Sequence, residues 1–217
     1  MQIYQRKFDE AVYSPDNYIN KNIVPLIKQL ADIIYDSKNH KEIEKKLNKL
    51  FASFYITFTF TKEISAFGIV GASTTNDRTQ SITIYLSTNL LALRNTTAMK
   101  QFFLELKSKI SHELIHRLQF IKANKDKLNL QKRITNEKEY MSDKHEIMAY
   151  AFNTVEYFRM IGLTDLDLIS RLKKKDIMLN SCFFYQKYNE VFNMEDKELK
   201  LYFKYMYMYL DGQARNI

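Results

Sequence analysis

The stretch ISHELIHRLQF, residues 110–120, decides how the chain is interpreted, because it contains His-Glu-x-x-His inside a segment with helical spacing, residues 97–123. At about 100° of rotation per residue, His112 and His116 lie within about 40° of each other, and Gln119 falls on the same side. The residues predicted to form the opposite, apolar stripe are Phe103, Ile110, Leu114, Leu118 and Ile121. The pattern predicts a helix with a histidine face and a core face.

The spacing of this motif is suited to zinc chemistry. Histidines four positions apart lie one helical turn apart, so that two imidazoles can bind one Zn²⁺ at about 2.0–2.1 Å. Glu113 lies about 100° from His112, on the flank of the histidine face, where its carboxylate can act as a general base without being a ligand. The motif therefore predicts His112 and His116 as metal ligands and Glu113 as the catalytic base. The alternative is a solvent-facing histidine pair, with Glu113 an ordinary helix former.

A catalytic zinc also needs a third protein ligand, and two adjacent residues are candidates. His145 and Glu146 both fall in the first turn of a second predicted helix, residues 143–161, and point about 100° apart. The small Ala149, one turn beyond Glu146, would allow the close helix approach that a carboxylate ligand needs. Asp143-x-x-Glu146 also matches a capping box, in which Glu146 would accept a backbone N–H and touch no metal.

The sequence HELIHRLQ followed by YMSDKHEIMAYA (140–151) resembles small zincin-like proteins of bacteriophages and bacteria, a group of presumed zinc metallopeptidases. The resemblance covers approximately residues 80–160, and its arrangement is that of gluzincins: His-Glu-x-x-His plus a downstream Glu. It implies a zincin-like fold and zinc-dependent hydrolysis of a protein or peptide. It also implies Glu113 as the base and a ligand set of His112, His116 and Glu146. Tyr150 departs from the pattern, because thermolysin-like enzymes carry an Asp there.

Zincin-like enzymes commonly hold an extended peptide against the edge strand nearest the active helix. The strand predicted for residues 81–87 precedes that helix by only a short loop. Its central residues, predicted to contact the substrate, are Thr83, Ile84 and Tyr85. The alternative is an internal strand without a substrate role. Stabilising the oxyanion of the transition state also requires a donor besides zinc, and Tyr140 and His145 are the nearby candidates.

Hydrophobic periodicity along the chain predicts one α+β domain, residues 1–217, with a small sheet on a mainly helical body. Alternating residues predict three strands, at 54–60, 66–73 and 81–87. Besides the two helices described above, helical spacing predicts helices over 17–37, 40–52, 165–175, 181–193 and 196–210. Pro25 marks either a first turn or a kink in the first of these.

The composition indicates in which compartment the protein acts and what class of partner it binds. The net charge of +8 would suit nucleic acid, but the lysines are mixed with Glu and Asp, as on solvated helix faces. The single cysteine, Cys182, excludes an internal disulfide, and neither a secretory signal nor a membrane span is predicted. We therefore expect a cytoplasmic protein, in a host cytoplasm if phage-encoded, acting on a protein or peptide. The competing hypothesis is a non-catalytic basic helical protein that binds nucleic acid or a protein partner, with zinc structural or absent.

Overall fold

The computed structural model describes most of the chain, which divides into two compact units, Met1–Leu128 and Asn129–Ile217. The described residues are 18–75, 79–94, 97–125, 136–174 and 177–214. They are mainly helical and include one small mixed sheet, which confirms the α+β class. The prediction that residues 1–217 form one domain stays a prediction.

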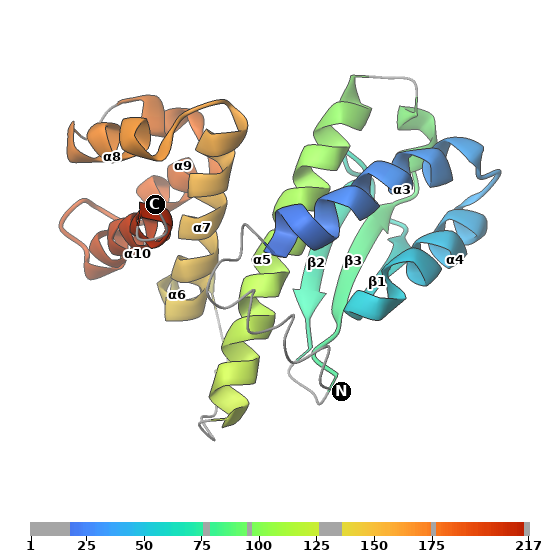
Figure 1. Ribbon diagram of the computed structural model, residues 1–217, viewed down its shortest axis with the longest axis horizontal. Coiled ribbons are helices and arrows are strands. Elements are labelled where there is room, and N and C mark those ends of the chain that lie inside the picture. The colour runs from blue at the N-terminus through green and yellow to red at the C-terminus, as the bar shows by residue number, and fades with distance from the viewer. Residues whose placement is uncertain (1–17, 76–78, 95–96, 126–135, 175–176, 215–217) are drawn as a thin grey trace. The chain divides into compact units, whose positions relative to one another are not determined.

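The described part of the N-terminal unit combines three α-helices with a three-stranded sheet (Figure 1). Its helices are α3 (Val24–Asp36), α4 (His40–Phe51) and α5 (Ala98–Lys125), and its strands are β1 (Ile56–Thr61), β2 (Ile69–Thr74) and β3 (Ile82–Ser87). Short helical turns flank them at Ile19–Ile23, Ala52–Phe54 and Leu90–Leu93. Pro25 lies in the first turn of α3, where its missing N–H costs no hydrogen bond. These elements confirm the predicted helices and strands to within a few residues.

The sheet has the order β1-β3-β2, so β3 is its central strand. β3 pairs in parallel with β1 and antiparallel with β2. The prediction that Thr83, Ile84 and Tyr85 lie on an edge was therefore wrong, because both backbone sides of this strand already form ladders. The central position of β3 agrees with its apolar side chains. Ile82, Ile84 and Leu86 are fully buried, as is typical of an internal strand.

Helix α5 is buried on every side over its central turns. It packs against β2, β3 and α3, and all eight residues from 110 to 117 are buried. The predicted division into a histidine face and a single core stripe was therefore too simple. Of that stripe, Phe103, Leu118 and Ile121 are only half-buried, whereas Phe102 and Leu106 are fully enclosed. A helix packed against several elements does not show the one-sided pattern of a surface helix.

Arg117 hydrogen-bonds α5 to the segments that precede β1 and β3. Its guanidinium donates from Nε to the Gln80 carbonyl at 2.7 Å, and from its two Nη atoms to the Phe54 and Tyr55 carbonyls at 2.7 and 2.9 Å. Tyr55 and Gln80 have positive φ, a conformation uncommon for residues other than glycine. Burial lowers the pKa of Arg117 to about 10, so the side chain stays charged at neutral pH. One charged, buried side chain thus donates to three backbone carbonyls that precede β1 and β3.

We expect Arg117→Met to destabilise the N-terminal unit by about 3 kcal/mol or more, because it removes three hydrogen bonds from a charged, buried donor. Lys109→Met is the matched control, since Lys109 is exposed on the same helix. Urea unfolding combined with hydrogen exchange of peptides from residues 54–75 and 98–117 measures the effect. Equal protection of these peptides in the two variants would contradict the role given to Arg117.

The C-terminal unit is helical throughout its described part. Its helices are α6 (Glu137–Ser142), α7 (Lys144–Met160), α8 (Asp165–Lys174), α9 (Phe183–Val191) and α10 (Lys197–Ala214), with a short turn at Ile177–Ser181. α7 packs against α9 and α10 around an aromatic core in which the rings of Tyr188 and Tyr202 stack at 4.5 Å between centroids. The tyrosine-rich tail is helical, as predicted, and α6 was not anticipated. Across the described ranges, no helix has both the length and the apolar character needed to cross a membrane.

Candidate metal centre

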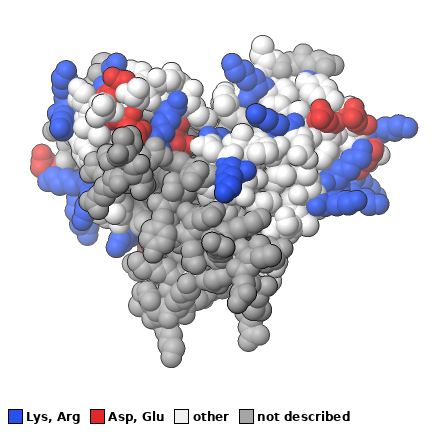
Figure 2. Space-filling view, viewed as in Figure 1, with Lys and Arg blue, Asp and Glu red and all other residues white. Residues whose placement is uncertain are grey.

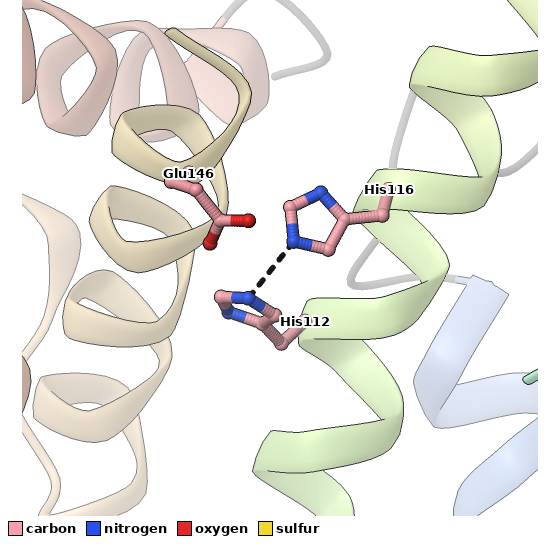
Figure 3. Close-up of side chains that lie close together, drawn as sticks. All are labelled: His112, His116 and Glu146. Carbon is pink, nitrogen blue, oxygen red and sulfur yellow. Dashed lines mark hydrogen bonds between the residues drawn. The ribbon is translucent and has the colours of Figure 1, made fainter. Parts of the chain in front are cut away.

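His112 and His116 bring two ring nitrogens to one point on α5. Their Nε2 atoms lie 3.0 Å apart, and the rings meet edge to face with centroids at 4.6 Å (Figure 3). Two ligands about 2.05 Å from a tetrahedral zinc would lie about 3.3 Å apart. The observed separation is close to that distance, and both side chains are buried. The pair therefore fits two neighbouring positions on one tetrahedral ion.

Gln119 orients one of the two imidazoles. Its Oε1 lies 2.9 Å from Nδ1 of His116, so that Nδ1 carries the proton and Nε2 keeps its lone pair for a metal. Ligand histidines in metalloproteins are usually held in this way through the second ring nitrogen. The sequence placed Gln119 on the histidine face but gave it no role. Its spacing of three residues from His116 was the available signal.

Glu113 follows His112 directly in α5 and is buried, and its carboxylate is hydrogen-bonded by a residue of the sheet. Thr74, the last residue of β2, places its hydroxyl 2.7 Å from Glu113 Oε2 and 3.0 Å from the Glu113 carbonyl oxygen. These contacts hold the carboxylate at one oxygen, and the role of Glu113 as a base stays a prediction. Thr74 could not be predicted as a partner of Glu113, because no local pattern relates two residues 39 positions apart.

His145 and Glu146 occupy the first turn of α7 in the C-terminal unit. Asp143 is the N-cap of this helix, and its side chain accepts the His145 backbone N–H at 2.8 Å. A capping box would direct the Asp143 N–H to Glu146, yet that N–H donates to the Tyr140 carbonyl at 3.1 Å. The backbone donor that the capping alternative assigns to Glu146 is therefore already engaged. The ring of His145 also faces its cap, with Nδ1 3.1 Å from Asp143 Oδ1.

Tyr150 occupies the position where thermolysin-like enzymes would carry an Asp. It lies one turn after Glu146 and forms a hydrogen bond with Lys187, whose ammonium also pairs with Glu137 at 3.1 Å. Burial raises the pKa of Tyr150, so its phenol stays neutral at physiological pH. Tyr140 is half-buried in α6. The role of Tyr140 or His145 in stabilising an oxyanion stays a prediction.

As donor types, the two ring nitrogens that His112 and His116 offer from α5 and the carboxylate that Glu146 offers from α7 could hold a metal ion (Figure 3). Both histidines are buried, and Glu146 is partly buried. Two imidazoles and a carboxylate are the ligand set of one class of catalytic zinc sites. The chemistry of the donors thus fits the predicted ion.

Comparisons with known proteins add no assignment. The chain matches no protein-family model, no curated protein and no solved structure.

Proposed function

We propose that the chain is a zincin-like zinc metallopeptidase that hydrolyses peptide bonds of a protein substrate. In this proposal His112, His116 and Glu146 hold Zn²⁺, and Glu113 is the general base. The observation that carries it is the convergence of the two Nε2 atoms at 3.0 Å, next to a buried glutamate of the same helix. A purely structural zinc site would not require Glu113.

Each residue has a distinct task in the reaction. A bound zinc supplies Lewis-acid chemistry, activating water and polarising a carbonyl. The Glu113 carboxylate accepts a proton from the attacking water and then returns it to the leaving amine as the peptide bond breaks. Gln119 keeps the Nδ1 proton of His116 in place, so that Nε2 remains a ligand throughout.

The substrate strand is assigned to β2 in place of β3. An added peptide strand needs the free side of an outer strand, and within the described ranges the outer strands of the sheet are β1 and β2. β2 packs against α5, whereas β1 packs against α4. β2 also ends at Thr74, which contacts Glu113. An extended peptide along β2 would therefore run toward the catalytic base.

The charge distribution does not favour the alternative of a nucleic-acid-binding protein. On the face shown in Figure 2, Lys and Arg side chains stand in several separate places, with Asp and Glu beside some of them. Among the described residues, Lys46 and Glu42 of α4 form an ion pair at 2.7 Å, and Arg159 and Asp165 form another at 2.8 Å. Mixed pairs of this kind are typical of a solvated surface, which agrees with the interpretation of the net charge.

The proposal is tested by measuring metal content and hydrolysis together. Elemental analysis of the purified chain is expected to give about one zinc per chain. Incubation with a denatured bacterial proteome, followed by mass spectrometry of new N-termini, should reveal cleavage that a zinc chelator abolishes and added zinc restores. This readout assumes no particular substrate. A zinc-loaded chain that generates no more N-termini than His112→Ala would favour the non-catalytic alternative.

A further inference from the structure

We propose that Thr74 is a positioning residue that sets the orientation of the Glu113 carboxylate. The inference rests on the proposed function, since it gives Glu113 the role of base. It concerns two residues of the N-terminal unit only, one at the end of β2 and one in the middle of α5.

The contact distances favour the carboxylate as the acceptor. The Thr74 hydroxyl lies 2.7 Å from Glu113 Oε2 and 3.0 Å from the Glu113 carbonyl oxygen. One hydroxyl carries one proton, so the two acceptors share or compete for it. A hydrogen bond to an ionised oxygen is shorter and stronger than one to a neutral carbonyl. The shorter contact is the one to the side chain, so Thr74 primarily holds Oε2.

Thr74 is itself held rigidly enough to act in this way. It pairs with Ile82 of the central strand, and the next residue, Thr75, donates its N–H to the Ser81 carbonyl at 2.9 Å. A β-branched side chain has few accessible χ1 rotamers, so its hydroxyl direction is set once the backbone is fixed. The sheet thus determines where the hydroxyl points.

As a consequence, the two oxygens of the Glu113 carboxylate have different roles. With Oε2 bound to Thr74, Oε1 is left to accept the proton of the attacking water. Glu113 is 6% exposed, and a buried carboxylate without this donor would have more freedom to turn from its working position. Thr74 therefore acts through Glu113 and does not touch the substrate itself.

A simpler role for Thr74 would be to tie β2 to α5 through the Glu113 carbonyl alone. The two roles differ in a double-mutant cycle between Thr74→Val and Glu113→Ala. Val is close to Thr in shape but lacks the hydroxyl, and Thr74→Ser retains the hydroxyl as the matched control. If the carboxylate is the main acceptor, the cost of Thr74→Val must fall when the carboxylate is absent.

Hydrogen exchange of the full chain without metal measures this cycle, through peptides covering β2 and the centre of α5. Thr74→Val is expected to raise local opening about tenfold when Glu113 is present, and several-fold less in the Glu113→Ala background. Thr74→Ser should stay near the parent. An equal effect of Thr74→Val in both backgrounds would overturn the proposal, because the bond would then be to the backbone only.

Hydrolysis by the zinc-loaded chain provides the second readout. Thr74→Val should lower kcat about tenfold to hundredfold with KM and zinc content unchanged, and Thr74→Ser should restore it. Unchanged kcat in Thr74→Val would overturn the positioning role. If the parent itself shows no hydrolysis, the proposed function fails, while the exchange cycle still decides whether Thr74 holds the Glu113 carboxylate.

Discussion

Glu113→Gln is expected to abolish most hydrolysis while leaving zinc content at the level of the parent chain. A general base contributes about 10²–10⁴-fold to the rate, so kcat should fall by a factor in that range. The amide is the size of the carboxylate and keeps an oxygen that the Thr74 hydroxyl can still bond, so the fold around α5 should be preserved. Only the ability to accept a proton is lost. Elemental analysis and the new-N-terminus assay, run on one preparation, measure both quantities.

His112→Ala is the variant to compare with Glu113→Gln, because His112→Ala removes a proposed ligand from the same turn of α5. Both zinc and hydrolysis should be lost in that chain. If Glu113→Gln loses zinc to the same extent, Glu113 is a ligand and its assignment as the base is wrong. Retained zinc with full hydrolysis would require the base to be a different residue.

The approach of His112 to His116 could be predicted because it depends only on helix geometry. Positions four apart share a face of any α-helix, whatever it packs against, and the structure indeed brings the Nε2 atoms of His112 and His116 together. The contact between Gln119 and His116 depends on the same geometry and could also have been predicted. Thr74 could not, because its approach to Glu113 requires β2 to pack on α5, which is a tertiary contact.

The elements of the fold were predictable for a similar reason, and their order in the sheet was not. Alternating residues identified three strands, but strand order depends on how the connections cross, so the central place of β3 became apparent only in the fold. Arg117 illustrates a second limit. A charged residue is expected at the surface, yet carbonyls presented at Tyr55 and Gln80, both with positive φ, allow its burial.

Glu146→Ala is expected to weaken zinc binding by more than about 100-fold, whereas His145→Ala should bind zinc like the parent. Loss even of a residue that only supports a ligand costs about 10–100-fold in metal affinity, and loss of a ligand should cost more. His145 is expected to be dispensable because its ring pairs with Asp143, the cap of its own helix. Competition with a zinc chelator of known affinity measures both variants.

The two substitutions are well matched, since they lie next to each other in the first turn of α7 and introduce the strongest helix former. The cap itself is unaffected by His145→Ala, because Asp143 accepts the backbone N–H of that residue. Circular dichroism should therefore show the same helix content in both chains, so that a difference in zinc affinity reports the ligand and not the fold. Zinc lost from His145→Ala and kept by Glu146→Ala would make the centre a three-histidine site. The two-histidine, one-glutamate arrangement, and the gluzincin interpretation with it, would then be wrong.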